Sequence, residues 1–528
     1  MNPLSSRRRL HRLLSSARRL NAQAEGRPVP APSTSGSTRR RFLKAMGLGA
    51  AAVATAPILA AGSGQPRIAI IGGGFAGLNA ALTLKKHGLG STVYEARQRT
   101  GGRVFSVGGV LGAGTVVNFG AELVNTDHAD ILELAAEFGV NLVDRLADAE
   151  ATVLEPTALL IDGQQLAEAD LAVALRRIAG RITRDAGKLD RNWDRWAPVF
   201  DALSVADYLD QNADALEAPY LRSLMEQLVR SEFGAEPEES SAIQLLFILP
   251  VVNGQEVELL SYSDERYFIA GGSSTLTNAM ASSLGNSVKL GRVLVGIDRV
   301  GGAYRLKFRD HPAVTADIVI VTVPNTALRN VDLDIPLPAA FRSFVNEVGL
   351  GVNEKVTPAF SRPFWRTDGR FAMEAVTSHE AFTSLWDESS LLGTSSKGIL
   401  QFYTGGNDAR CALEGSPTSK ANQFVQALAA YFPEAATTYT GQAVRTNWLR
   451  DPFSLGAYAS FAPGQLTQFG EFGWYDDPAD PASRTEVRFG DVLFAGEHTD
   501  VDWYGFMNGG ASSGRQAAAS VLRGLGML

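Results

Sequence analysis

Residues 67–95 read RIAIIGGGFAGLNAALTLKKHGLGSTVYE and decide the fold of the first folded part of the chain. The apolar run 67–71 predicts a short, buried parallel strand. A glycine-rich turn follows at 72–77, and then an alanine-rich amphipathic stretch that ends near Gly88, a natural helix terminator. A second strand closes on Glu95, so we expect a βαβ unit with the glycine turn between its first strand and its helix.

The GxGxxG spacing in this unit is the fingerprint of a dinucleotide-binding turn. Gly72 permits the tight turn, Gly74 lets the backbone approach a pyrophosphate, and Gly77 lets the helix pack close to the strand. The helix N-terminus offers N–H groups and a partial positive charge to phosphates. Glu95 can accept hydrogen bonds from both ribose hydroxyls. A glycine turn without a ligand is the alternative, which the complete strand, turn, helix and acid disfavour.

Residues 95–103, EARQRTGGR, continue the fingerprint with two glycines beside three arginines. Guanidinium groups suit bidentate contact with phosphate, so this is a second phosphate-handling turn. ExRxRxGGR after a GxGxxG unit resembles the flavin-dependent amine oxidase family, which includes monoamine, polyamine and L-amino-acid oxidases. The resemblance implies FAD and an α/β fold. In this fold a Rossmann-like FAD-binding domain of the two-dinucleotide-binding type is interleaved with an α+β substrate-binding domain.

Later segments extend the resemblance over nearly the whole chain after the first 65 residues. They are NFGAE at 118–122, YFIAGG at 267–272, the β-branched run IVIVTVP at 318–324, and LFAGEHT with WYGFMNGG between 493 and 510. The resemblance implies FAD contacts at Gly72, Gly74, Phe75, Ala76, Gly77, Glu95, Ala96, Arg97, Gly102, Arg103, Ala121, Glu122, Val293, Gly496, Glu497, Gly505, Phe506 and Met507.

The same resemblance implies a division of the chain into domains. Two segments lack phosphate motifs and would cover the flavin. The first has apolar residues at helical spacing, as in 166–182 and 220–229, and the second mixes strands with helices. We expect an export signal with a basic extension in 1–65, an FAD-binding domain from 66–122, 266–340 and 450–528, and a substrate-binding domain from 123–265 and 341–449.

Residues 341–449 would form the second segment inserted between parts of the FAD-binding domain. Two of its residues match family positions near the reactive part of the flavin. Lys355, in GVNEK, matches a lysine that holds a water against the reactive flavin nitrogen, where its charge would assist reoxidation by dioxygen. Trp448 matches a tryptophan near the flavin. A surface lysine on an edge strand and a core tryptophan are the structural alternatives.

An aromatic cage is the expected substrate site. Tyr458 and Phe506 occupy its two family positions, with Trp503 nearby, and aromatic core packing is the alternative for each. Phe506 replaces the commoner tyrosine. Ala457 stands where some members have a cysteine that bonds the flavin, so FAD should be bound non-covalently. Glu122 would either attract an ammonium group or serve as an ordinary backbone-bonded carboxylate.

The resemblance implies an amine oxidase that transfers hydride to flavin, releases an imine for hydrolysis and passes electrons to dioxygen, giving hydrogen peroxide. L-amino-acid oxidase is disfavoured because Glu122-Leu123-Val124 offers no arginine for a carboxylate, although Arg266 could substitute. A dehydrogenase using another acceptor, a relative of carotenoid desaturases or porphyrinogen oxidases, and a non-catalytic FAD-binding scaffold remain open. A homodimer is also open.

Other classes of function have little support in the composition. Cys411 is the single cysteine and the six histidines lack ligand spacing, so we expect no metal site and no intrachain disulfide. Ten arginines and Lys44 lie within residues 1–61, which makes the rest of the chain more acidic than the net charge of −7 indicates. An acidic body disfavours nucleic acid and mildly favours cationic substrates.

The N-terminal region resembles an address for export. Residues 38–44 read TRRRFLK and precede an uncharged, Ala/Gly-rich stretch at 45–61, as in twin-arginine signals. This predicts passage through the translocase for folded proteins to a periplasmic or extracellular location. A basic tail and an uncleaved anchor are the alternatives, and residues 1–37 have no assignment.

Overall fold

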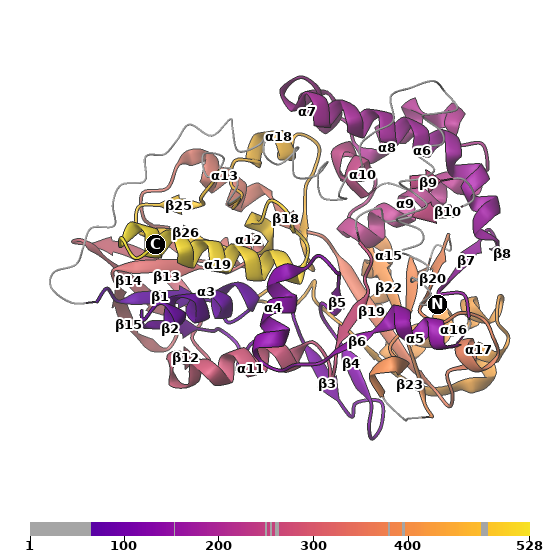
Figure 1. The fold of residues 1–528 in the computed structure, drawn as a ribbon, viewed down its shortest axis with the longest axis horizontal. Coiled ribbons are helices and arrows are strands. Elements are labelled where there is room, and N and C mark those ends of the chain that lie inside the picture. Colours follow the sequence, from indigo (N-terminus) through magenta and orange to yellow (C-terminus); the bar gives the residue numbers. More distant parts are fainter. Residues whose placement is uncertain are drawn as a thin grey trace, which may run out of the picture.

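The glycine turn lies at the centre of the sheet that organises one half of the molecule in this computed structural model (Figure 1). The expected unit is present as β1 (Ile68–Ile71), α3 (Phe75–Lys86) and β2 (Ser91–Tyr94). β1 is buried at every residue, as its apolar sequence requires. The structure describes residues 65–152, 154–248, 251–253, 256–258, 263–378, 381–392, 396–476 and 484–528.

Distant parts of the chain complete this six-stranded sheet. Its order is β12-β2-β1-β16-β26-β25, and all neighbours are parallel except the last pair. The added strands are β12 (Val288–Lys289), β16 (Ile318–Val321), β25 (Arg488–Phe489) and β26 (Val492–Phe494). The β-branched run at 318–324 and the segment near 493 thus join the sheet of the first βαβ unit, in which β16 pairs with β1 and β26 pairs with β16. This arrangement confirms the Rossmann-like fold.

Helices α3 and α19 (Met507–Gly524) pack together against this sheet (Figure 1). They approach closely because Gly514 has no side chain: a Cβ there would lie 2.0 Å from the carbonyl oxygen of Ala76. A four-stranded sheet of order β15-β14-β13-β17 contacts the six-stranded sheet where β14 meets β16. Its strands are β13 (Leu294–Val300), β14 (Ala303–Phe308), β15 (His311–Ala316) and β17 (Asp332–Asp334).

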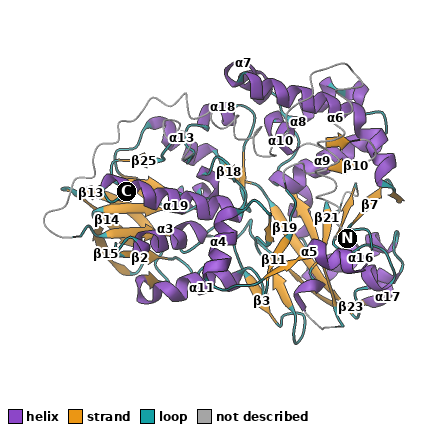
Figure 2. Cartoon of the chain, in the orientation of Figure 1, coloured by secondary structure: helices purple, strands orange, loops and turns teal. Residues whose placement is uncertain are grey.

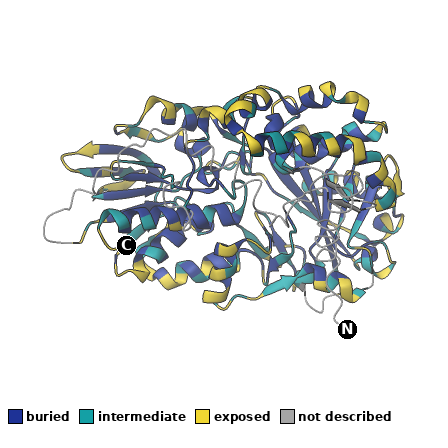
Figure 3. Cartoon of the chain, turned by 45° about the horizontal axis from the view of Figure 1, so that its top comes forward, coloured by how far each residue is buried: buried dark blue, intermediate teal, exposed yellow. Residues whose placement is uncertain are grey.

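The other half of the molecule is built on a seven-stranded sheet of order β23-β19-β22-β21-β20-β7-β8 (Figure 2). Its central strands are buried throughout, whereas the helices that surround it are exposed on their outer faces (Figure 3). The strands are β7 (Thr157–Ile161), β8 (Gln164–Leu166), β19 (Asn353–Phe360), β20 (Glu374–Thr377), β21 (Ser384–Asp387), β22 (Gly398–Gly405) and β23 (Tyr439–Arg445).

Helices of the first inserted segment lie above this sheet. The apolar spacing at 166–182 and 220–229 falls on α6 (Glu168–Arg191) and α9 (Tyr220–Phe233), as the sequence predicts. The neighbouring helices are α7 (Trp193–Asp201), α8 (Val205–Gln211) and α10 (Ala242–Ile248). α9 ends at Gly234, whose φ of +59° is the left-handed conformation that glycine adopts without strain. This turn places the last residues of α9 beside the cavity described below.

A small sheet of order β5-β11-β6 connects the two halves. It contains β5 (Leu123–Val124), β6 (Leu142–Asp144) and β11 (Tyr267–Ile269). The domain boundaries drawn from the sequence remain a prediction. Across residues 65–528, apart from the gaps given above, no helix combines the length and apolarity that crossing a bilayer requires. The predicted export signal lies outside the described residues.

Candidate active site

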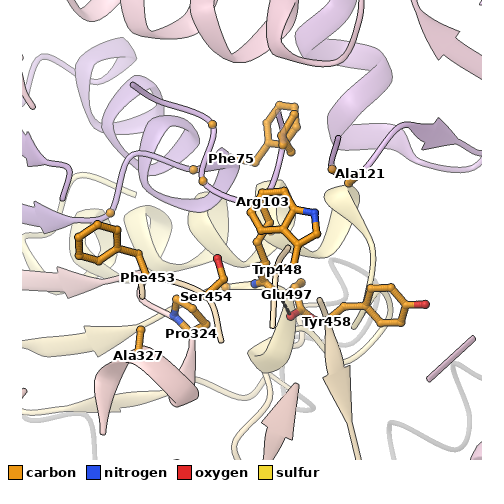
Figure 4. Close-up of a pocket in the computed structure, with 18 of the residues that line it drawn as sticks. Phe75, Arg103, Ala121, Pro324, Ala327, Trp448, Phe453, Ser454, Tyr458 and Glu497 are labelled. Carbon is orange, nitrogen blue, oxygen red and sulfur yellow. Dashed lines mark hydrogen bonds and ion pairs between the residues drawn. The ribbon is translucent and has the colours of Figure 1, made fainter. Parts of the chain in front are cut away.

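A cavity of about 600 Å³ extends from the glycine turn to the inserted segments. Among the described residues, its wall includes all the expected FAD contacts except Gly77. These are Gly72, Gly74, Phe75, Ala76, Glu95, Ala96, Arg97, Gly102, Arg103, Ala121, Glu122, Val293, Gly496, Glu497, Gly505, Phe506 and Met507. Figure 4 shows the wall with Phe453 and Tyr458 toward opposite sides and Arg103 near Glu497. Segments that are far apart in the sequence, at 72–103, 121–122, 293 and 496–507, therefore line one cavity.

Both glycine turns contribute bare backbone to one end of this cavity. A Cβ on Gly102 would lie 3.6 Å from the Cα of Gly74, and the N–H of Gly101 donates to the carbonyl of Gly73 at 2.8 Å. The Glu95 carboxylate accepts hydrogen bonds from the N–H of Gly73 at 2.7 Å and of Arg97 at 2.8 Å. It thereby joins the two turns while it lines the cavity.

Gly77 lies directly beneath the turn instead of at the cavity surface. A Cβ on this glycine would lie 2.0 Å from the carbonyl oxygen of Gly72 and 3.1 Å from Oγ1 of Thr322. The residue therefore acts through close packing of α3 on the sheet, which is the role that the fingerprint assigns to its third glycine.

The N-termini of two helices open onto the cavity without side-chain caps. α3 begins after Gly74 and α19 after Phe506, and neither residue's side chain bonds the free N–H groups of its helix. Uncapped N–H groups and the helix dipole attract negative charge. A dinucleotide with a pyrophosphate and an electron-accepting ring fits these two helix starts, so the residues present fit FAD.

An ion pair joins the arginine turn to the C-terminal segment. Nη1 of Arg103 lies 2.6 Å from Oε1 of Glu497 and donates to the carbonyl of Ala457 at 2.7 Å. Glu497 also accepts a hydrogen bond from the N–H of Gly505 at 2.7 Å. Burial opposes ionisation of Glu497, but Arg103 and these hydrogen bonds hold its pKa below the ordinary value. The carboxylate therefore fixes three segments of the cavity wall.

Lys355 lies inside the seven-stranded sheet, because β19 pairs with β22 on one side and β23 on the other. The alternative of a surface lysine on an edge strand is therefore wrong. Its Nζ donates to the carbonyl of Gly120 and to Oε1 of Glu122, each at 2.7 Å, and lies 5.5 Å from the ring centre of Trp386. The ammonium group forms part of the cavity wall.

Aromatic side chains dominate the end of the cavity beyond Lys355. Trp448 lines it and donates from Nε1 to the carbonyl of Phe119 at 2.7 Å. The hydroxyl of Tyr458 bonds that of Tyr403 at 2.7 Å and donates to the carbonyl of Ser231 at 2.5 Å. Phe506 is part of the same wall. The structure thus brings Trp448, Tyr458 and Phe506 to one cavity.

Trp503 differs from the expectation that it borders the site. It does not belong to the described residues that line the cavity. Its ring instead lies 4.9 Å from His128 and 6.2 Å from Phe506, centre to centre. The N–H of Trp503 donates to Oδ1 of Asp500 at 2.7 Å, and this turn directs its ring behind the wall. Trp503 therefore supports Phe506 from outside.

Sequence reasoning did not identify two acids in the inserted segments, Glu232 and Glu265, which line the same cavity. Burial, and then the charge of Glu265, raise the pKa of Glu232 to about 8. Glu232 lies at the end of α9 and Glu265 precedes β11, and neither belongs to a motif. The aromatic residues Tyr403 and Trp386 of the wall were missed for the same reason.

The backbone of Glu265 is held in an unfavourable conformation. Its φ of +41° is in the left-handed region that residues with a side chain rarely adopt. The side chain of Asn125 accepts its N–H at 3.0 Å, and the guanidinium of buried Arg145 donates to its carbonyl at 2.8 Å. Strain of this kind persists only where surrounding contacts fix it. The position of Glu265 is therefore determined by two side chains.

No arginine from the described part of segments 123–265 and 341–449 lines the cavity. Those that line the cavity are Arg97, Arg103, Arg292 and Arg309, from the arginine turn and the β13–β14 region. Arg266, the candidate for binding a substrate carboxylate, instead pairs with Asp144 at 2.5 Å. Within the described ranges there is also no group of three or more potential metal ligands.

Known proteins resemble this chain over most of its length. Residues 75–522 match the family described as flavin containing amine oxidoreductase. Flavin-containing amine oxidase B of Canis lupus familiaris is 25% identical over 488 residues, covering 88% of each chain. Its counterpart in Sus scrofa is 26% identical over 477 residues, covering 87% of each.

Solved structures have the same fold. A putrescine oxidase bound to putrescine superposes with a TM-score of 0.71 at 22% identity, covering 87% of this chain and 99% of the other. Cyclohexylamine oxidase from Brevibacterium oxydans gives a TM-score of 0.68 at 19% identity, covering 88% of this chain and 100% of the other.

Proposed function

The chain belongs to the flavin containing amine oxidoreductase family and oxidises amines with FAD, and we propose that its preferred amine carries a second cationic group. The observation that supports this substrate class is the presence of Glu232 and Glu265 on the aromatic side of the cavity. Carboxylates in a poorly hydrated wall favour ammonium groups. None of the cavity-lining arginines among the described residues comes from the segments 123–265 and 341–449, which argues against a substrate carboxylate.

The side chains divide the work of the reaction. FAD, when bound, accepts the hydride from the carbon next to the amine nitrogen. Tyr458 and Phe506 provide ring faces that orient the amine and exclude water. The two hydrogen bonds of the Tyr458 hydroxyl fix that ring in place. Lys355 places a positive charge on the same wall, and we propose dioxygen as the electron acceptor, with hydrogen peroxide as product.

Anaerobic mixing of the purified holoenzyme with amines tests the reaction itself. Bleaching of the flavin absorbance by diamines, and peroxide formation when air is admitted, are the expected results. Bleaching without peroxide would point to another electron acceptor. A flavin that no amine bleaches would contradict the proposal.

The substrate class is tested by Glu232→Gln. At about pH 9, where Glu232 is ionised, we expect the KM for a diamine to rise about 10- to 100-fold in the variant, because a hydrogen bond to a charged group contributes about 1.5–3 kcal/mol. The KM for a monoamine of the same chain length should change little. Glu226→Gln is the matched control, since Glu226 lies on the same helix, pairs with Arg222 and is not part of the cavity wall. If Glu232→Gln raises the KM for the diamine and for the monoamine equally, Glu232 does not bind a second cationic group of the substrate.

The pKa of Glu232 adds a pH dependence to this test. Below about pH 8 the acid is protonated, so a dication must displace that proton before it can pair with the carboxylate. The KM for the diamine should therefore fall as pH rises from 7 to about 9, while the distal ammonium is still charged. Glu232→Gln should abolish this dependence. If the slope persists in the variant, another group controls binding.

We also propose that the protein is exported in its folded, FAD-loaded form. The support is the TRRRFLK sequence followed by the uncharged stretch to residue 61. Replacing Arg39 and Arg40 by lysine should retain the protein in the cytoplasm with its activity intact, as fractionation and immunoblotting will measure. Unchanged export of that variant would refute this route.

A further inference from the structure

A buried cluster of charged and polar side chains lies behind the cavity wall. It consists of Glu122, Lys355 on β19, Glu388 directly after β21, and Gln401 on β22. Glu122 and Lys355 are 3% and 7% exposed, whereas Glu388 and Gln401 are fully buried. Glu122 and Lys355 line the cavity, and Glu388 and Gln401 lie outside the set of described residues that do so. Water therefore cannot screen a charge on Glu388.

The hydrogen bonds of the cluster leave two carboxylate oxygens without a partner. Oε1 of Glu122 accepts from Lys355, and Oε1 of Glu388 accepts from Nε2 of Gln401 at 2.7 Å. In the described part of the chain, Oε2 of Glu122 and Oε2 of Glu388 are buried and accept no hydrogen bond. The Glu388 side chain is nevertheless within hydrogen-bonding reach of Glu122.

One ammonium group cannot compensate two ionised carboxylates in such a place. A buried unpaired charge is strongly destabilising, and two acids at one site favour the protonation of one of them. Burial and the neighbouring charge of Glu122 raise the pKa of Glu388 well above its ordinary value. A single proton between the two carboxyl groups would give both unpartnered oxygens a hydrogen bond and make the cluster electrically neutral.

We propose that Glu388 is a positioning residue that holds a proton against Glu122 and thereby keeps the ion pair of Glu122 and Lys355 fixed at the cavity wall. This proposal rests on the proposed function, in which the charge of Lys355 assists the transfer of electrons to dioxygen. Tyr403 on β22 is a further titratable group that faces Glu122, and its hydroxyl bonds Tyr458. Arg366 pairs with Asp387, which precedes Glu388, and with Asp148, so its positive charge does not compensate the cluster.

The shared proton is tested by infrared spectroscopy of the holoenzyme with Glu388→Gln. At neutral pH the wild-type protein should show a protonated carboxyl band that shifts in D₂O and is missing in the variant. Glutamine retains the shape, donates to Glu122 and accepts from Gln401. Asp500→Asn is the control, because burial also raises the pKa of Asp500, yet Asp500 is not among the cavity-lining residues. A difference spectrum with only carboxylate bands would overturn the shared proton.

Stability provides a second readout that does not depend on catalysis. The raised pKa of Glu388 contributes stability at low pH that is lost as pH rises through that pKa. Glu388→Gln cannot ionise, so its Tm relative to wild type should increase steadily from acidic to alkaline pH. A difference in Tm that stays constant across pH would contradict the raised pKa.

The positioning role is tested by comparing two replacements. Glu388→Gln should keep the rate of reoxidation by dioxygen near that of wild type, because glutamine can still donate a hydrogen bond to Glu122. Glu388→Leu should lower this rate about tenfold or more, because leucine cannot hold Glu122 and the charge of Lys355 in place. FAD content serves as the folding control. Equal rates in both variants would refute the positioning role. A failed role for Lys355 would leave the infrared and Tm results intact, so the two failures are distinguishable.

Discussion

Lys355→Met should slow the reoxidation of the enzyme by dioxygen about 100- to 1000-fold, the usual effect of removing one preorganised charge from a site where charge develops. Electrons that pass to dioxygen create negative charge beside this wall. The ammonium group is held there by Gly120 and Glu122, so it needs no rearrangement when that charge forms. Double-mixing stopped-flow measurements, with the flavin first reduced by an amine, separate this step from substrate oxidation.

The control for this experiment must show that FAD binding survives. Methionine has a similar length and occupies the space of the lysine side chain. Lys397→Met is the matched control, because Lys397 bonds the carbonyl of Leu111 and is not in the described cavity wall. If Lys355→Met loses FAD in the same proportion as it loses reoxidation, the lysine has only a structural role.

The FAD-binding part could be predicted from the sequence because its constraints are local. Gly72 must adopt a φ of +111°, and Gly77 must lack a Cβ. Such demands leave fixed residues at fixed spacings. The apolar runs at β16 and β26 indicate buried strands on their own, but their order in the sheet, with β16 beside β1 and β26 beside β16, does not follow from those runs.

The rest of the site depends on contacts between segments far apart in the chain. Glu388 reaches Glu122 because β21 pairs with β22 in one register, with Asp387 opposite Leu400. A shift of one residue would reverse which side chains face the cavity. No short-range pattern records that register. Glu232 on α9 and Glu265 before β11 could not be predicted from the sequence either, because their proximity depends on how the inserted segments pack.

Trp503 illustrates a different limit. Its spacing from Phe506 correctly indicates that the two rings are neighbours, as their contact shows. Which of them faces the cavity depends on the turn between Asp500 and Gly509. A Cβ on Gly509 would lie 2.1 Å from the carbonyl oxygen of Trp503, so the turn packs tightly on the start of α19. Motif spacing indicates proximity, whereas the direction of a side chain depends on such packing.

Gly77→Ala should abolish FAD retention and lower the free energy of unfolding by about 3 kcal/mol or more. Overpacking a tight contact typically costs about 1–3 kcal/mol, and the cost is at the upper end here because the obstructing atom belongs to the backbone and cannot move aside as a side chain can. The new Cβ would lie 2.0 Å from the carbonyl oxygen of Gly72. Helix α3 would have to move away from the sheet. It cannot retreat freely, because Gly514 of α19 already touches its other side.

Gly90, in the loop that follows α3, provides the control position for Gly77 in that experiment. A Cβ on Gly90 meets no atom within 4 Å, and its φ is not in the left-handed region, so Gly90→Ala should behave as wild type. The measurements are the ratio of flavin to protein absorbance after gel filtration and the Tm of each variant. A Gly77→Ala protein with full FAD content and unchanged Tm would mean that α3 can be displaced without cost. In that case the approach of its N-terminus to the pyrophosphate would not be what binds the cofactor.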